Sequence, residues 1–446
     1  MTSAVTNNLR KELLDQLKSS VEGVDNYYVG FSRSGDFTQA TDISSNSEQF
    51  KLRNSLQSVK ILSNASFVVP TVTWSSGGIY EAYEDNNSEQ TNFYVVNSSD
   101  EVYICIEQGK DAFNTVANSI VEPSGALNGN TFKTSDGYKW RLMYKMSAAA
   151  ISNFKTASYM PVSTIQDSAS SLSVPEEITQ RLIQDNAVSG EILSVAIDDA
   201  SGTGYLPSST ISITGDGTGA SFSMSVDDNG VNRVLIDSDG SGSFSHGSGY
   251  SHAATIATDG TGVTLRPVIS PPGGLAVDPV VSLKSRSLML QVDIQGDEAG
   301  TLVSENDFRQ VVLLKNPKQH NSNTVFSGNT GNCLKYFETS VATGDFLEDE
   351  LVSTSSNSAR LKVFYHDRPA SRLYYYQDQE TGFDSISNNA VIQNITGTTR
   401  SLTVLSLGDP DIDAYSGEIL YLNNISSSIT REETQTEDIR IVIELG

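Results

Sequence analysis

The residues that come closest to a metal site are two histidines, His246 and His252, in a stretch rich in Gly and Ser. No third ligand follows them at a spacing that zinc sites use. The two cysteines, Cys105 and Cys333, are too few for a thiolate site or a disulfide framework. We therefore expect solvated loop histidines and two half-buried thiols, in a protein made in a reducing compartment.

Two acidic clusters carry the residue types that bind calcium. LIDSDGSGS holds Asp237 and Asp239, and GDPDIDAYSGE holds four carboxylates: Asp409, Asp411, Asp413 and Glu418. The second cluster lacks the glycine at position six of an EF-hand loop, and its glutamate comes two places early. We expect solvated acidic turns at both places.

Motifs of known catalytic chemistry do not occur in the sequence. It contains no HExxH, no GxSxG and no GxxxxGK[ST] motif. Gly215, Gly217 and Gly219 superficially resemble a phosphate-binding loop, but no lysine follows them, and the segment has the pattern of a strand and a turn. The sequence therefore predicts no enzyme, no catalytic residue, no metal and no cofactor.

The overall charge excludes several classes of partner. Of the 446 residues, 54 are acidic and 29 are basic, which gives a net charge of −25 at pH 7. Nucleic acids and anionic membrane surfaces attract basic proteins, so we expect neither as a partner. The sequence also has no apolar run of about 18 residues and no signal peptide at its start.

The composition and the hydrophobic periodicity predict a mainly β protein. Charged residues make up only 19% of the chain, and Ser, Thr, Asn and Gly, which favour turns and strand edges, are abundant. Alternating segments predict strands in β-sandwich or barrel layers. One helix is expected near the N-terminus, where apolar residues recur at helical spacing: Leu9, Leu13, Leu14, Leu17 and Val21.

The clearest predicted strand is GYKWRLMYKM. Five apolar residues share one face and three basic residues lie on the other: Tyr138, Trp140, Leu142, Tyr144 and Met146 against Lys139, Arg141 and Lys145. We therefore expect a half-buried strand, with an aromatic core on one face and solvated cations on the other.

An internal repeat interrupts the predicted β core. GTGYLPSSTISITGDGTGA starts at Gly202 and is echoed by GSGYSHAATIATDGTGV, which starts at Gly247. Two copies are too few for a solenoid, so we predict a small inserted β-domain made of two related halves. The predicted segments are 1–184 for the N-terminal helix and the first part of the β core, 185–274 for the Gly-rich insert, 275–317 for the return to the core, 318–412 for a second β-rich inserted region and 413–446 for the closing strands.

An aromatic and basic stretch, RLKVFYHDRPASRLYYYQD, contains three consecutive tyrosines. Their side chains cannot all lie on one face of a strand, so at least one ring is expected to be partly exposed. Tyr and Arg are common at the centres of protein interfaces. We therefore predict Tyr375, Arg368 and Arg372 as interface residues.

Seven segments of the chain follow one another in a characteristic order after the N-terminal helix: YYVGFSRSGDF, VKILSNASFVVPTVTW, VYICIEQGKD, DGYKWRLMYKM with YMPVST, SLMLQVDIQGDEAGTLVSENDFRQVVLLKNP, YSGEILYLNN and EDIRIVIEL. In this order they resemble the baseplate wedge subunit encoded by gene eight of T-even-like contractile-tailed bacteriophages. The resemblance covers roughly half of the chain. The Gly-rich repeat and much of 318–412 have no counterpart in it and look like insertions.

The resemblance implies a non-enzymatic, mostly β homodimer of the virion tail baseplate, made in the host bacterial cytoplasm. Its implied partners are the wedge subunits numbered seven, six and ten. The family has no catalytic residues to carry over. Phe308 is expected to anchor a strand, Arg309 to meet a carboxylate, and Asn316-Pro317 to end the strand. The fold-defining motifs fall on Gly137, Tyr138, Trp140, Phe308, Arg309, Gln310, Asn316, Pro317, Ser416, Gly417 and Glu418.

Two other functions stay open on the sequence. A tail adhesin or spike would bind or cleave host surface glycan through the Gly-rich insert, and such spikes are usually trimers. A bacterial surface protein would need a signal peptide, which we do not find. The insertions also leave open which neighbours a wedge subunit of this length contacts.

Overall fold

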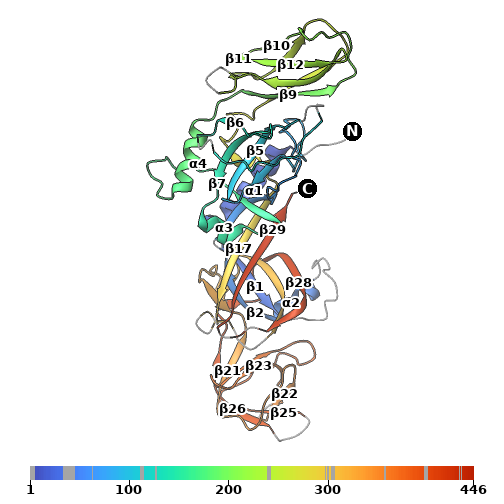
Figure 1. Ribbon diagram of the computed structural model, residues 1–446. Helices are drawn as coiled ribbons and strands as arrows, with labels where there is room; N and C mark the ends of the chain where they lie inside the picture. Colours follow the sequence, from blue (N-terminus) through green and yellow to red (C-terminus); the bar gives the residue numbers. More distant parts are fainter. Residues whose placement is uncertain are drawn as a thin grey trace. The chain divides into compact units, whose positions relative to one another are not determined.

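The computed structural model describes residues 6–33, 46–62, 64–110, 115–125, 128–238, 243–296, 298, 301–302, 307–355, 358–395, 400–430, 432 and 434–445. Within them the chain is mainly β, with several antiparallel sheets, one small closed barrel and a helix near the N-terminus, as the sequence predicts (Figure 1). It divides into two compact units: unit 1 is Met1–Gln16, Ser66–Met289 and Val442–Gly446, and unit 2 is Leu17–Ala65 and Leu290–Ile441. The five segments drawn from the sequence stay a prediction.

The helices are short. The predicted N-terminal helix is α1 (Asn7–Ser19), which continues as a π-helical turn, η1 (Ser20–Val24). Leu14 is buried, whereas Leu9 and Leu13 are about half exposed, so the buried stripe is narrower than the sequence pattern indicated. The described residues also contain four helices that we did not predict: α2 (Asn46–Asn54), α3 (Ala148–Phe154), α4 (Pro175–Asp185) and α5 (Pro279–Ser282).

Unit 1 is organised by a four-stranded antiparallel sheet with the strand order β4-β5-β7-β6. Its strands are β4 (Tyr94–Val96), β5 (Glu101–Glu107), β6 (Thr131–Lys133) and β7 (Lys139–Lys145). A second sheet has the order β29-β17-β3-β8. Its strands are β3 (Asn64–Pro70), β8 (Tyr159–Val162), β17 (Ser287–Gln295) and β29 (Thr436–Glu444), and the chain passes between the units within β3, β17 and β29.

Strand β7 corrects one prediction. Its apolar face is core, as expected, and Trp140 is fully buried. The opposite face is not solvated, because Lys139 and Arg141 are 3% and 5% exposed. Only Lys145, at the end of the strand, stays partly open to solvent. A strand buried on both faces needs partners for its charges, and these partners come from other segments of unit 1.

The strands from β9 to β16 pair among themselves in unit 1 (Figure 1). They form four antiparallel pairs, and one apolar cluster that includes Tyr205, Phe222 and Tyr250 fills the space between them. The strands are β9 (Ile192–Asp199), β10 (Ile211–Gly215), β11 (Thr218–Ala220), β12 (Phe222–Asp227), β13 (Gly230–Ile236), β14 (His246–Ser248), β15 (Ala253–Ala257) and β16 (Thr264–Ile269).

The two copies of the repeat interlock within this small β body. Thr203 of the first GxGY pairs with Thr261 of the second DGTG, and Ser248 of the second GxGY pairs with Thr218 of the first DGTG. Each tyrosine covers a glycine of the other copy, so that a Cβ on Gly260 or Gly217 would lie 2.6 or 2.4 Å from the ring. Glycine is therefore required at these positions for close packing.

Unit 2 contains a five-stranded antiparallel sheet with the order β20-β2-β1-β18-β28. Val311, Val312, Leu313 and Leu314 are all buried, which confirms the prediction that this run is covered on both faces. A short pair joins β19 (Lys318–Gln319) to β27 (Ile412–Asp413). The sheet strands are β1 (Tyr27–Ser32), β2 (Leu56–Ile61), β18 (Asp307–Lys315), β20 (Thr330–Asn332) and β28 (Glu418–Thr430).

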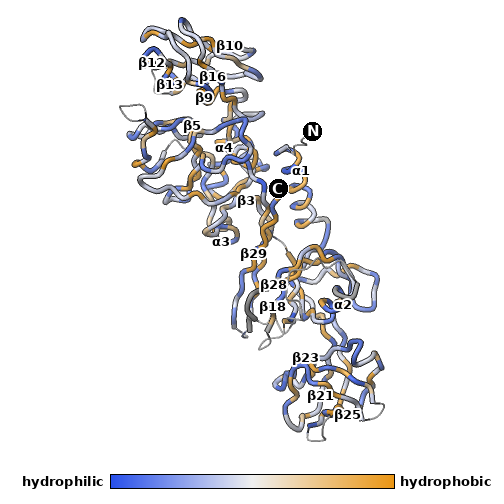
Figure 2. The backbone as a smooth tube through the Cα atoms, turned by 90° about the vertical axis from the view of Figure 1, so that its right-hand side faces the viewer, coloured by the Kyte–Doolittle hydropathy of each residue, from blue (hydrophilic) through white to orange (hydrophobic). Residues whose placement is uncertain are grey.

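Unit 2 also contains a closed six-stranded barrel with the order β21-β24-β23-β22-β25-β26. Buried and half-buried residues alternate along β22 and β25, and hydrophobic and hydrophilic residues alternate along the barrel strands in Figure 2. This period of two gives the barrel its own apolar core. Its strands are β21 (Lys335–Thr339), β22 (Leu351–Thr354), β23 (Arg360–Asp367), β24 (Arg372–Tyr376), β25 (Val391–Asn394) and β26 (Ser401–Gly408).

Candidate functional site

A buried ion pair joins strand β7 to the start of β9. The guanidinium of Arg141 meets the carboxylate of Glu191 through two hydrogen bonds, Nη1 to Oε2 at 2.6 Å and Nη2 to Oε1 at 3.0 Å. The two side chains are only 6% and 8% exposed. Arg141 also donates to the hydroxyl of Thr131 through Nε and Nη2. The planar fork of arginine suits this geometry, and it satisfies charges that burial would otherwise make costly.

His246 completes this network and corrects another prediction, because it is buried and not solvated. Its Nδ1 lies 2.9 Å from the carbonyl of Ile192, and its Nε2 lies 2.8 Å from the hydroxyl of Thr131. Burial, and next the charge of Arg141, lower the pKa of His246 to about 4. The carbonyl can only accept, so in the neutral ring Nδ1 carries the proton and Nε2 accepts from Thr131. Both ring nitrogens are therefore occupied, and neither is available to a metal.

Lys139 forms a second charged contact between β7 and the insert strands. Its ammonium lies 2.8 Å from Oε2 of Glu107 and 4.8 Å from the ring centre of Phe244. Arg233, in β13, meets the other oxygen of Glu107 at 3.1 Å. The cations that the sequence placed in solvent thus hold β5 and β7 to the strands of the Gly-rich body.

The DGYKW motif forms a rigid corner before β7. One oxygen of Asp136 accepts from the backbone N–H groups of Ile120 and Val121, both at 2.9 Å. Gly137 follows with a φ of 94°, a conformation that favours glycine. Tyr138 then stacks on Trp140, with ring centres 5.5 Å apart and planes at 16°. These motif residues are buried structural residues, with no group presented to a substrate.

The FRQ and KNP motifs lie at the two ends of β18. Phe308 is buried and packs edge-on against Phe31, with ring centres 5.1 Å apart. Gln310 is 1% exposed, whereas the side chain of Arg309 lies outside the described residues, so its predicted ion pair stays a prediction. Asn316 ends the strand with a φ of 49° and accepts from the N–H of Asn26 at 2.9 Å. Pro317 follows it.

The YSGE motif forms a backbone corner of unit 2 with Arg53. The guanidinium of Arg53 donates to the carbonyls of Ala414, Ser416 and Gly417 at 3.0, 2.6 and 2.8 Å. Gly417 has a φ of 74°, and a Cβ there would lie 2.8 Å from a backbone oxygen of β18. Glu418 then begins β28 opposite the end of β18. This corner fixes the register of the outer strand.

The three predicted interface residues do not form one patch. Arg368 is half exposed and pairs with Asp345. Arg372 and Tyr375 lie three residues apart in β24, so their side chains point to opposite faces of the strand. The ring of Tyr375 stacks at 4.2 Å on Phe337, in the barrel core. Their role in an interface stays a prediction.

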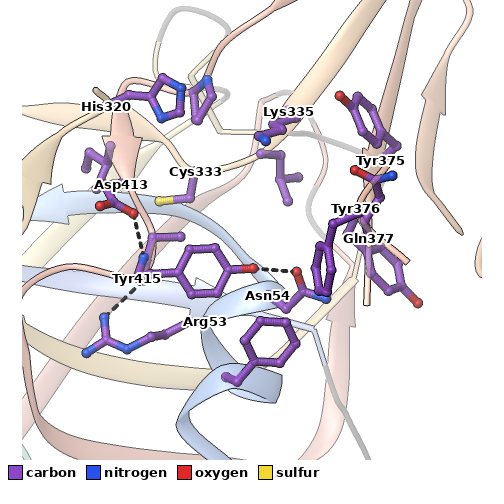
Figure 3. A pocket seen from close by; sticks show the side chains of 16 residues that line it. Arg53, Asn54, His320, Cys333, Lys335, Tyr375, Tyr376, Gln377, Asp413 and Tyr415 are labelled. Atoms are coloured by element: carbon purple, nitrogen blue, oxygen red, sulfur yellow. Dashed lines mark hydrogen bonds between the residues drawn. The ribbon is translucent and has the colours of Figure 1, made fainter. Parts of the chain in front are cut away.

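An aromatic pocket of about 330 Å³ lies in unit 2, between helix α2, the segment after β20, the end of β24 and the segment after β27 (Figure 3). We define it by six of its lining residues: Phe50, Asn54, Lys335, Gln377, Phe383 and Tyr415. Figure 3 shows Tyr415 across the pocket, with its hydroxyl on Asn54 and its backbone N–H on Asp413. The sequence gave no sign of this pocket, because its residues come from four separate segments.

The acidic clusters and the cysteines carry no site in the described part of the chain. Asp411 accepts from the N–H of Asn332 at 2.9 Å, and Asp237 accepts from the hydroxyl of Ser221 at 2.6 Å. Asp239 lies outside the described residues. No group of three or more His, Cys, Asp or Glu that could hold a metal ion is found among the residues described. Cys105 and Cys333 are both buried thiols, more deeply covered than we expected.

Comparisons with known proteins do not identify the chain. No family model matches it, and no curated protein matches it either. Among the helices of the described residues, none combines the length and apolar character that crossing a bilayer requires.

Proposed function

We propose that the protein is a structural subunit of a contractile phage tail, a component of the baseplate wedge, with no enzymatic activity. The observation that carries the proposal is where the resembling segments lie. They fall in order on β1, β2 and β3, β5, β7 and β8, β17 and β18, β28 and β29, which are the long strands of both units. The segments without a counterpart form two small bodies, β9–β16 and the barrel β21–β26, each with its own apolar cluster.

The side-chain chemistry of the framework supports a scaffold. Its charged groups are used internally, as in the Arg141–Glu191 pair and the three backbone bonds of Arg53. Its aromatic residues are packed ring on ring, as for Tyr138 and Trp140. Such a protein works by holding its neighbours in one arrangement and by tolerating another after contraction, when interfaces and not cores rearrange.

The charge of the chain indicates how it would assemble. A net charge of −25 would steer basic surfaces of neighbouring wedge subunits toward it, and salt screens such steering. Permanent contacts between subunits typically bury some 2,000–5,000 Å² in total. We therefore expect association that is fast at low ionic strength and slower at high ionic strength, and a stable complex once it has formed.

The proposal is tested by mass and by co-assembly. Light scattering on a sizing column should give a particle of twice 48.0 kDa for the purified chain. Co-expression with the wedge subunits numbered seven, six and ten should yield a common complex, whose rate of formation falls as salt is added. A trimer that binds host glycan and forms no such complex would contradict the proposal and favour a tail adhesin.

A further inference from the structure

The aromatic pocket of unit 2 keeps large rings open to solvent. Phe383 is 64% exposed and Tyr415 is 51% exposed. Phe50 lies between them: it stacks on Tyr415, with ring centres 5.5 Å apart and planes at 22°, and meets Phe383 edge-on at 6.3 Å. Three aromatic side chains thus line one side of a hollow and leave ring surface uncovered. Exposed aromatic surface in a hollow is typical of a binding site.

The polar groups of the pocket are largely used within the protein. Asn54 accepts from the hydroxyl of Tyr415 at 2.9 Å. The side-chain amide of Gln377 donates to two backbone carbonyls at 3.1 and 3.0 Å. Arg53 is saturated by three carbonyls. A sugar needs free partners for its hydroxyl groups, and unpaired hydroxyls weaken binding. The pocket is therefore better suited to an apolar ring than to a glycan.

One positive charge at the pocket has no partner. The Asp413 carboxylate lies near Arg53, whose pKa is lowered by burial and raised by that carboxylate. His320 faces Asp409, with Nε2 3.7 Å from Oδ1. Lys335 is exposed, and within the described part of the chain no carboxylate lies at ion-pair distance from its ammonium. In a protein with a net charge of −25, an unpaired lysine beside an apolar hollow indicates an acidic ligand.

We propose that this pocket binds a segment of a partner polypeptide in which an aromatic side chain is followed by a carboxylate. The ring lies among Phe50, Phe383 and Tyr415, and the carboxylate pairs with Lys335. The volume of 330 Å³ is near the lower limit of ligand pockets, about 300 Å³, which suits one anchoring side chain. The identity of the partner as a neighbouring tail subunit rests on the proposed function.

The proposal is tested on the full chain with two small probes that differ in one group. N-acetylphenylalanine has the ring and the carboxylate, and N-acetylphenylalaninamide has the ring alone. Calorimetric titration should give a Kd on the order of 1 mM for the acid, which is what its size allows. The amide should bind about fivefold more weakly, because it lacks the pairing with the ammonium of Lys335.

Two variants assign the contacts. Lys335→Ala should weaken the acid about fivefold and leave the amide unchanged, so that the two probes become equal. Phe383→Ala should weaken both probes by about fivefold or more. The side chain of Phe383 is mostly exposed, so this change should leave the melting temperature within about 2 °C of the wild type. Arg368→Ala, at an exposed arginine of the same barrel outside the pocket, is the matched control and should change neither affinity.

Several results would overturn the proposal. One is that neither probe binds at about 10 mM, and another is that Lys335→Ala weakens acid and amide equally. A third is tighter binding of N-acetylglucosamine than of the acid, which would assign the pocket to glycan. The titration uses the chain and the probes alone. A failure of wedge co-assembly therefore leaves its result standing, and a failure of the titration leaves the wedge proposal untouched.

Discussion

Removal of the Glu191 carboxylate should destabilise unit 1 more than any loss of surface charge. Glu191→Gln would leave the guanidinium of Arg141, which is 6% exposed, without its countercharge and with weaker hydrogen bonds. Breaking a buried ion pair on one side costs about 3 to 5 kcal/mol. For a unit of this size that corresponds to a fall in melting temperature of roughly 6 to 20 °C.

The second prediction from the same pair concerns its replacement. The double variant Arg141→Met with Glu191→Leu removes both charges together, so no buried charge is left unpaired. It should recover most of the stability that Glu191→Gln loses, because well-packed apolar residues often replace a buried ion pair at little cost. Arg368→Ala is the surface control, since that arginine and its partner are 50% and 66% exposed, and it should cost at most about 1 kcal/mol.

The assay must resolve the two units, because a chain of several units does not unfold in one step. Hydrogen exchange read on peptides from β9 and β14 reports the contact directly, and calorimetry gives the melting temperature of the whole. A loss of about 3 kcal/mol should speed exchange in these strands more than 100-fold. Unchanged exchange in Glu191→Gln, or a double variant no more stable than the single one, would refute the reasoning.

Three further predictions follow from the described contacts. The pKa of His246 is about 4 in the folded chain and near 6.5 when unfolded, so its stabilising effect is complete above pH 6.5 and falls as the pH drops toward 4. Urea unfolding at pH 7 and 4.5 should show this loss, about 3 kcal/mol at most, and His246→Gln should make the dependence shallower. Trp140→Ala should cost about 3 to 5 kcal/mol and reduce soluble yield, and a soluble variant with unchanged melting would contradict the assignment of that face to the core. Gly417→Ala places a Cβ 2.8 Å from the carbonyl oxygen of Lys315 at a φ of 74°, so thermal denaturation should show a loss of about 1 to 3 kcal/mol.

The alternation of side chains predicted the strands well, because a period of two depends only on neighbouring residues. It placed β1, β5, β7, β18 and β29, and it assigned Trp140 to the core. It failed for the opposite face of β7. The partners of Lys139 and Arg141 are Glu107 and Glu191, which lie far away in sequence, and nothing near β7 shows that they will be there.

The same limit applies to His246 and to the aromatic pocket. A lone histidine among Gly and Ser resembles a solvated loop residue, and only the folded chain brings Thr131 and the carbonyl of Ile192 to its ring. Phe50, Phe383 and Tyr415 lie in segments with no common pattern. Contacts that depend on long-range pairing leave no local periodicity, so they are found only from the structure.

The interlocked repeat has a consequence for how such a body arises and grows. Each copy supplies its GxGY to the DGTG of the other, and the equivalent strands β10 and β15 pair antiparallel, so the two copies are related as the halves of a symmetric pair. A third copy would find no unpaired partner, so the array is closed at two and cannot lengthen by further duplication. A single copy made alone would satisfy its glycine and tyrosine contacts only in a second molecule of itself. The insert therefore has the architecture of a small homodimer whose two chains became one.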